Sequence, residues 1–215
     1  GTLVDTLGDF TLSLNAMLAD LGLATLSTEQ VRALIGRGSE HLIQGALKLQ
    51  APQAKPDQVQ ALYPQAMRSF QNHYHAHNGR HSHVYPGGVE GLKLMRHRGW
   101  SLACVTNKPH AFAQELLRLK GLSDYFDEVV GGDSHPRKKP DPLPLIKTCE
   151  RLQTLPEVTL MVGDSVHDAH AAHAAACPLV LVDYGYHQGS DLDALGACAV
   201  LSRLDQIPFD TLTPS

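Results

Sequence analysis

The first part of the chain carries apolar residues at helical spacing. From about residue 7 to residue 74, apolar side chains recur every three or four positions, and strand-like alternation is scarce. The pattern predicts successive helices that include residues 12–21, 31–35, 39–47 and 56–75. We therefore expect a small all-helical lobe over residues 7–83.

After residue 88 the pattern changes, because short apolar runs now alternate with helical segments. The apolar runs predict strands at residues 102–105, 129–130, 160–162 and 179–182. The segments between them predict helices at residues 89–98, 109–120, 143–152 and 168–176. Such alternation is typical of an α/β fold with a parallel sheet wrapped by helices, in which ligands bind at the carboxyl ends of the strands.

Composition and charge narrow the functional classes. Hydrophobic residues make up 43% and charged residues 19% of the chain, as in a packed globular protein. A net charge of −4 gives no basic footprint, so nucleic acid is not an expected partner. No apolar run approaches the roughly 20 residues of a membrane helix. The cysteines are widely spaced, which argues against disulfides and structural zinc and predicts buried thiols in a cytoplasmic protein.

An acidic motif follows one predicted strand. The strand at residues 158–162 leads into Gly163-Asp164-Ser165, and a helix is predicted to begin near Asp168. Two carboxylates at one strand end are suitable ligands for a hard cation such as Mg²⁺. Alternatively, Asp164 and Ser165 cap the helix while Asp168 interacts with its positive end.

Thr106 and Asn107 follow the predicted strand at residues 102–105 and precede a helix. A hydroxyl and free amides at a helix N-terminus form a site that suits a phosphate group. The alternative is that one of these two residues is an ordinary helix cap.

Lys139 lies in the segment Arg137-Lys138-Lys139-Pro140-Asp141-Pro142, where the prolines restrict the backbone just before a helix. A lysine fixed near the edge of the sheet can neutralise charge on a transferring phosphoryl group. Alternatively, the lysine run is only a solvated surface.

A threonine, a lysine and an acidic pair at successive strand ends, in this order, resemble the haloacid-dehalogenase-like superfamily. The chain is most similar to phosphoglycolate phosphatases, although several of the matching stretches recur in sugar phosphatases. The stretches are GTLVDT, LIGRGSEHLIQGAL, YPGGVEGL, VTNKPHAFAQELL, GGDSHPRKKPDPLPL, MVGDSVHDAHAAHAA and DYGY. The resemblance implies a Rossmann-like parallel sheet core at residues 1–6 and 84–215, with an inserted all-helical cap at residues 7–83.

The resemblance also implies a role for each candidate site residue. Thr106 and the amide of Asn107 would bind the phosphoryl oxygens, and Lys139 would balance negative charge. Asp164 would ligate Mg²⁺. Asp168 would complete the acidic cluster, either through a metal-bound water or by orienting Lys139.

Arg37 lies in the GRGS turn of the helical lobe, which resembles the substrate-reading loop of the superfamily. By its chemistry alone Arg37 is a surface residue. The resemblance implies a Mg²⁺-dependent phosphatase, a monomer or homodimer, that cleaves a small phosphorylated metabolite, above all 2-phosphoglycolate, through an aspartyl-phosphate. A sugar-phosphate phosphatase and a phosphoglucomutase are the alternatives. A dehalogenase is disfavoured, because relatives of that type need no metal and Asp164 is kept here.

The sequence departs from the superfamily at its beginning. In the superfamily, GTLVDT follows a hydrophobic strand ending in D-x-D, whose first aspartate attacks phosphorus and whose second protonates the leaving oxygen. Residues 1–215 begin at Gly1, and Asp5 is too far along the motif to replace these groups. We therefore expect the first core strand to precede Gly1 in the intact protein, and residues 1–215 alone to be inactive. The alternative is a catalytically inactive relative that binds a phosphorylated ligand or a protein partner.

A histidine-rich stretch closes the helical lobe. It contains His73, His75, His77, His81 and His83. Such tracts can bind transition metals. The spacing does not place three of these side chains on one helical face, so we do not predict a zinc or nickel site here.

Overall fold

A computed structural model describes residues 1–52 and 56–209 of the chain. The chain folds into two compact units. One, the helical unit, spans Thr6–His83, and the other, the core unit, combines Gly1–Asp5 with the chain from Val84 onward. The lobe boundary expected from sequence, residue 7, lies one residue further along the chain.

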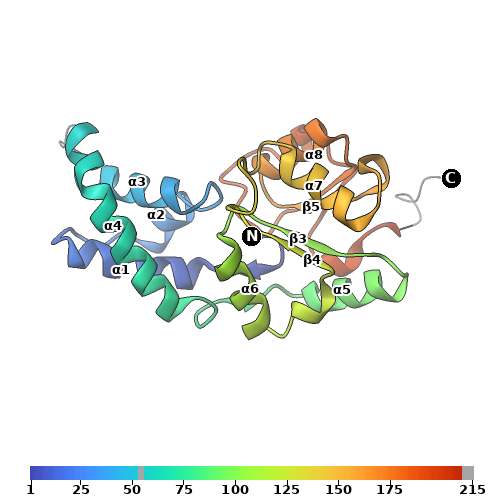
Figure 1. The fold of residues 1–215 in the computed structure, drawn as a ribbon, viewed down its shortest axis with the longest axis horizontal. Coiled ribbons are helices and arrows are strands. Elements are labelled where there is room, and N and C mark those ends of the chain that lie inside the picture. The colour runs from blue at the N-terminus through green and yellow to red at the C-terminus, as the bar shows by residue number, and fades with distance from the viewer. Residues whose placement is uncertain (53–55, 210–215) are drawn as a thin grey trace. The chain divides into compact units, whose positions relative to one another are not determined.

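The helical unit consists of α1 (Leu7–Asp20), α2 (Thr28–Arg32), α3 (Ser39–Gln50) and α4 (Pro56–His77). The long helices α1 and α4 pack along each other (Figure 1), with Leu14 and Met17 of α1 fully buried. Tyr74 of α4 stacks on Phe10 and on Phe70, with ring centroids 5.0 and 5.4 Å away. The helical spacing of apolar residues correctly predicted α1, α3 and α4. The helix predicted at residues 31–35 is wrong in its position, because α2 begins at Thr28, where Ser27 caps it, and ends at Arg32, so that Leu34 and Ile35 lie in the following turn.

Asp9 is a fully buried carboxylate within the helical unit. Its Oδ2 accepts a hydrogen bond from the amide of Gly79 at 2.8 Å, and its Oδ1 accepts one from the amide of His81 at 2.7 Å. The carboxylate therefore fastens the segment after α4 to the first turn of α1.

We expect Asp9→Ala to lower the free energy of unfolding by about 2–3 kcal/mol, because two amides lose a charged acceptor inside the protein. Urea denaturation followed by circular dichroism measures the change. Asp57→Ala, which removes an exposed carboxylate from the first turn of α4, is the control and should cost less than about 1 kcal/mol. Equal stability of the Asp9 variant and wild type would contradict this role.

Among the residues described, the main ladders of the core unit are all parallel. Two short strands, β1 (Val4–Asp5) and β2 (His83–Val84), pair separately. The strands of the main ladders are β3 (Ala103–Val105), β4 (Glu128–Val130), β5 (Met161–Gly163), β6 (Leu179–Val182) and β7 (Ala199–Leu201). β3 pairs with β4, and β6 pairs with β5 on one side and β7 on the other. The predicted parallel α/β core is confirmed, whereas β7 was not predicted.

Helices cover both faces of these ladders. They are α5 (Gly88–His97), α6 (His110–Leu119), α7 (Leu143–Leu152) and α8 (Val166–Ala175). Alternation along β6 decides which face each residue buries: Val180 and Val182 pack in the cluster that includes residues of α5 and α6, and Leu179 and Leu181 in the cluster with α7 and α8 (Figure 1). Single-turn 3₁₀ helices at Ser123–Tyr125 (η1), Pro156–Val158 (η2), Asp193–Leu195 (η3) and Leu204–Gln206 (η4) complete the unit.

Helix ends in the core unit follow local signals. Gly99 and Gly121 follow α5 and α6 with φ of +78° and +67°, as expected for residues that end a helix in the left-handed region. α8 begins at Val166, two residues before the predicted start, because the side chain of Ser165 accepts the amide of Asp168 and caps the helix. Asp168 therefore lies inside the first turn.

A cavity of about 460 Å³ separates the two main ladders of the core unit. All of β3 lines it from one ladder, and Met161 and Val162 of β5 line it from the other. Thr2 and Leu3 also contribute to its wall. The sequence predicted one sheet, but β3 and β5 are not hydrogen-bonded to each other, and their facing edges border this cavity.

The remaining global features are few. All four cysteines are free; Cys149 and Cys177 are buried, but Cys198 is exposed, so the expectation of buried thiols is wrong there.

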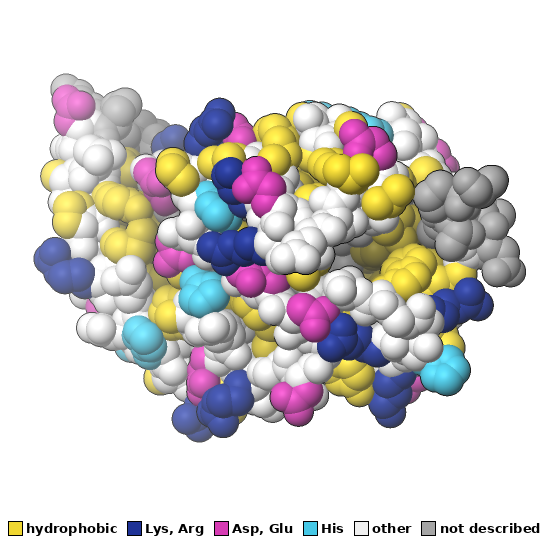
Figure 2. Space-filling model, turned by 45° about the vertical axis from the view of Figure 1, so that its right-hand side comes forward, with side chains coloured by type: hydrophobic (Ala, Val, Ile, Leu, Met, Phe, Trp, Pro, Cys, Tyr) yellow, Lys and Arg dark blue, Asp and Glu magenta, His cyan; other side chains and the backbone are white. Residues whose placement is uncertain are grey.

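Within residues 1–52 and 56–209, no helix has both the length and the apolar character needed to span a membrane. On the face shown in Figure 2, cationic and anionic side chains are interspersed.

Candidate active site

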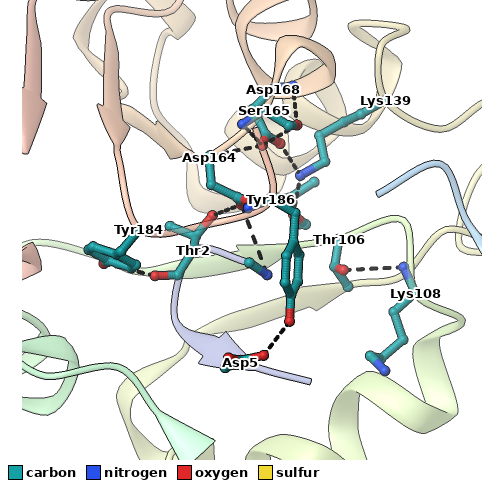
Figure 3. Close-up of polar contacts among 12 residues, drawn as sticks. Thr2, Asp5, Thr106, Lys108, Lys139, Asp164, Ser165, Asp168, Tyr184 and Tyr186 are labelled. Atoms are coloured by element: carbon teal, nitrogen blue, oxygen red, sulfur yellow. Dashed lines mark hydrogen bonds and ion pairs between the residues drawn. The ribbon is translucent and has the colours of Figure 1, made fainter. Parts of the chain in front are cut away.

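Lys139 is the centre of a buried polar cluster in the core unit (Figure 3). Its Nζ lies 2.7 Å from Oδ1 of Asp168 and donates a hydrogen bond of 2.7 Å to the carbonyl of Val105, the last residue of β3. The side chains of Lys139 and Asp168 are only 9% and 7% exposed. Lys139 is therefore a fixed, buried cation at the carboxyl end of β3 and not part of a solvated lysine run.

Asp168 is held by donors on both oxygens. Oδ1 pairs with Lys139, and Oδ2 accepts hydrogen bonds from the amides of Asp164 and Ser165, both at 3.1 Å, and from the Ser165 hydroxyl at 2.8 Å. Burial, the largest influence, acts to raise the pKa of Asp168. The charge of Lys139 and these hydrogen bonds together outweigh it and lower the pKa below its ordinary value. The carboxylate is therefore ionised and ideally placed to orient Lys139.

Asp164 follows β5 directly and is buried. Its Oδ1 accepts a hydrogen bond of 2.6 Å from the hydroxyl of Thr2, and the Gly1 nitrogen lies 4.0 Å from the same oxygen. Its Oδ2 accepts a hydrogen bond of 2.8 Å from the amide of Tyr186. These contacts bring the beginning of the chain to the carboxyl end of β5.

The donor set fits Mg²⁺ in part. Carboxylate oxygens are the ligands that this hard cation prefers, and it commonly retains several waters. Among the residues described, no three His, Cys, Asp or Glu side chains gather into a group that could hold a metal. Asp164 therefore fits as one ligand of an incomplete shell. Asp168 is already engaged by Lys139 and Ser165, so its direct ligation of a metal stays a prediction.

Thr106 and Asn107 form the turn between β3 and α6. The amide of Thr106 donates to the carbonyl of Val130 in β4 at 2.9 Å, and its hydroxyl accepts the amide of Lys108 at 3.2 Å. The side chain of Asn107 donates to the carbonyl of Lys139 at 2.9 Å. The turn thus places Thr106 at the end of the strand that also carries the carbonyl bonded to Lys139 (Figure 3), and Asn107 ties the two loops together.

Arg37 is exposed in the turn between α2 and α3, flanked by Gly36 and Gly38 with φ of +114° and +91°. It belongs to the helical unit, whereas the other candidate site residues belong to the core unit. A substrate-reading role for Arg37 therefore stays a prediction.

Sequence reasoning missed Thr2, Gly185 and Tyr186, which all contact Asp164. The hydroxyl of Thr2 and the amide of Tyr186 bond its carboxylate, and Gly185 packs against its side chain. The DYGY stretch was noted only as part of the resemblance. A backbone amide that bonds a carboxylate 22 residues earlier leaves no signal in hydrophobic periodicity.

Comparison with known proteins identifies the family of the chain. The family model described as "Haloacid dehalogenase-like hydrolase" matches residues 1–182. The chain belongs to this family. The haloacid-dehalogenase-like resemblance inferred from sequence is thereby confirmed, and with it the class of fold.

Relatives of this haloacid-dehalogenase-like hydrolase cover nearly all of the chain. It is 43% identical to a phosphoglycolate phosphatase of Nitrosospira multiformis over 95% of this chain and 88% of the relative. It is also 43% identical to a plasmid-encoded phosphoglycolate phosphatase of Cupriavidus necator, over 100% of this chain and 90% of the relative. The crystal structure of a predicted phosphoglycolate phosphatase from Haemophilus somnus superposes with a TM-score of 0.90 at 32% identity, covering 98% and 94% of the two chains.

Proposed function

We propose that this chain is the main part of a Mg²⁺-dependent phosphate monoesterase. The observation that carries the proposal is the buried ammonium of Lys139, held between Asp168 and the end of β3. A fixed cation of this kind stabilises charge on a transferring phosphoryl group without reorganising during the reaction. The same strand ends present the Thr106 hydroxyl and the Asp164 carboxylate.

Each residue has one task in this proposal. Lys139 neutralises charge on the phosphoryl group and on its nucleophile, and Asp168 keeps the ammonium of Lys139 in place. Thr106 donates its hydroxyl to a phosphoryl oxygen, with the amide of Asn107. Asp164 holds Mg²⁺, which supplies further positive charge for the phosphoryl oxygens.

We further propose that the nucleophile comes from a D-x-D strand that precedes Gly1 and lies in the cavity between β3 and β5. Both facing strand edges line this cavity, as do Thr2 and Leu3. Thr2 is bonded to Asp164 at the carboxyl end of β5, so a strand that enters Gly1 through the cavity would run parallel to its neighbours. Its carboxyl end would then deliver carboxylates beside Asp164 and Lys139, where an aspartyl-phosphate can form.

The proposed substrate is 2-phosphoglycolate. Curated relatives named phosphoglycolate phosphatase, 43% identical over nearly the whole chain, support this choice. We propose a monomer or homodimer in the cytoplasm, with a small phosphorylated metabolite and not nucleic acid as its partner. The four free cysteines suit that reducing compartment.

A phosphate-release screen tests the substrate. Full-length protein with Mg²⁺ is given 2-phosphoglycolate, glucose 1-phosphate, glucose 6-phosphate and phosphoserine. We expect kcat/KM for 2-phosphoglycolate to exceed that for the others at least about 100-fold, a difference of roughly 2.7 kcal/mol in transition-state binding. Equal slow rates on all four esters would contradict the substrate, and no release at all would favour a ligand-binding relative.

The role of the preceding strand has its own test. We expect residues 1–215 alone to release no phosphate, because none of the proposed site residues within them is a free nucleophile. In the full-length protein, Asp→Asn at the first aspartate of D-x-D should abolish turnover, whereas Asp5→Asn should leave measurable activity. Phosphate release by residues 1–215 at the full-length rate would overturn the proposal.

A further inference from the structure

The loop after β6 contacts the candidate metal carboxylate, Asp164, and also the end of β1. Tyr186, whose side chain is buried, donates its amide to Oδ2 of Asp164 at 2.8 Å. Its hydroxyl donates to Oδ1 of Asp5 at 2.5 Å, at the end of β1 (Figure 3). The ring therefore anchors the loop to β1 while the amide of the same residue holds Asp164.

Gly185 brings the loop backbone directly against Asp164. A Cβ added at Gly185 would lie 2.3 Å from Cβ of Asp164 and 2.6 Å from its Oδ2. Both distances are far below van der Waals contact. A larger residue would therefore displace either the loop or the carboxylate.

The second oxygen of Asp164 is fixed from the same loop. Oδ1 accepts the Thr2 hydroxyl, and the carbonyl of Thr2 accepts the hydroxyl of Tyr184 at 3.0 Å. Tyr186 thus restrains Oδ2 of Asp164 directly, and Tyr184 restrains Oδ1 through Thr2.

We infer that Gly185 and Tyr186 are positioning residues that hold the Asp164 carboxylate in the orientation required for a divalent cation. The inference rests on the proposed function, because it takes Asp164 as a metal ligand. Residues that hydrogen-bond a ligating carboxylate fix its direction, and their loss typically weakens metal affinity by about 10- to 100-fold. Gly185 permits the close approach of the loop backbone to Asp164, and the buried side chain of Tyr186 holds the loop in place against β1.

Isothermal titration of full-length protein with Mg²⁺ tests this inference without reference to turnover. Tyr186→Phe keeps the ring and the amide but removes the bond to Asp5, and we expect it to raise the Mg²⁺ dissociation constant about 10-fold. Gly185→Ala places a methyl group against Asp164, and we expect a rise towards 100-fold. Tyr125→Phe, which removes a hydroxyl from η1, is the matched control and should bind Mg²⁺ like wild type.

A second measurement separates positioning from general structural damage. At saturating Mg²⁺, Tyr186→Phe should regain a kcat within about threefold of wild type, because only metal occupancy was lowered. Dissociation constants within twofold of wild type for both Tyr186→Phe and Gly185→Ala would overturn the inference. If instead Asp164→Asn binds Mg²⁺ as tightly as wild type, the metal assignment of the proposed function fails first, and the positioning role fails with it.

Discussion

Lys139→Met is expected to reduce phosphate release at least about 1000-fold, equivalent to roughly 4 kcal/mol of transition-state stabilisation. The buried ammonium lies 2.7 Å from Asp168 and is bonded to Val105, so neither water nor a surface lysine can replace it. The substitution also leaves the carboxylate of Asp168 buried without its cation. Removal of one partner from such a pair costs about 3–5 kcal/mol of stability.

The free energy of unfolding at acidic pH should also depend on the contact between Lys139 and Asp168. Because the pKa of Asp168 is lowered in the folded protein, its contribution is complete above the ordinary value of 3.8 and is lost as the pH falls towards the folded pKa. In Lys139→Met, burial acts without the compensating cation, so the loss of stability should begin at higher pH. Urea denaturation between about pH 3 and pH 7 measures this shift.

Two further variants separate catalysis from stability. Lys139→Met combined with Asp168→Asn removes both charges and should recover part of the lost stability, because no uncompensated charge stays buried, but none of the turnover. Lys138→Met removes the preceding lysine and should keep activity within about threefold of wild type. Full phosphate release by Lys139→Met would remove this residue from the catalytic set.

The elements that were correctly predicted from sequence share one physical cause. Apolar side chains at helical spacing must face a core, as Leu14 of α1 does. A short uninterrupted apolar run indicates a strand that is buried on both faces, as β6 is. β7 (Ala199–Leu201) was not predicted, and its length does not explain the omission, because β3, β4 and β5 also have three residues each. The split between β3 and β5 was also not predicted, since periodicity reports which face is buried and not which edges pair.

In the candidate site, too, local sequence spacing predicted some features, whereas contacts between distant residues determine the others. The spacing of Asp164 and Asp168 predicted that both carboxylates lie near one strand end, but it left two roles open for Asp168. Those roles differ by a contact with Lys139, 29 residues earlier in the chain, which the structure places at 2.7 Å. The capping alternative is also correct in part, because Ser165 and Asp168 form a capping box at the start of α8. One motif therefore serves the helix and the candidate site together.

Asp164→Asn is expected to lower Mg²⁺-dependent phosphate release at least about 1000-fold and to leave stability nearly unchanged. The asparagine oxygen can still accept the Tyr186 amide, and its –NH2 group can donate to the Thr2 hydroxyl oxygen, so both hydrogen-bond positions around β5 can remain occupied. What it loses is the negative charge, which attracts a divalent cation more strongly than a neutral amide oxygen does. Stability and function should therefore separate at this position, in contrast to Lys139.

Phosphate release against Mg²⁺ concentration, together with thermal unfolding, checks the expected result for Asp164→Asn. Asp183→Asn is the matched control, because Asp183 is exposed and its Oδ2 accepts the Ser202 hydroxyl instead of facing the candidate site. The control should reproduce the wild-type Mg²⁺ dependence. If Asp164→Asn also did so, Mg²⁺ would have to be held without this carboxylate, and the buried contacts of Asp164 with Thr2 and Tyr186 would have only a structural purpose. If Asp164→Asn instead loses turnover but keeps its stability, Asp164 is a metal ligand, because the hydrogen bonds of the site persist while the ligand is gone.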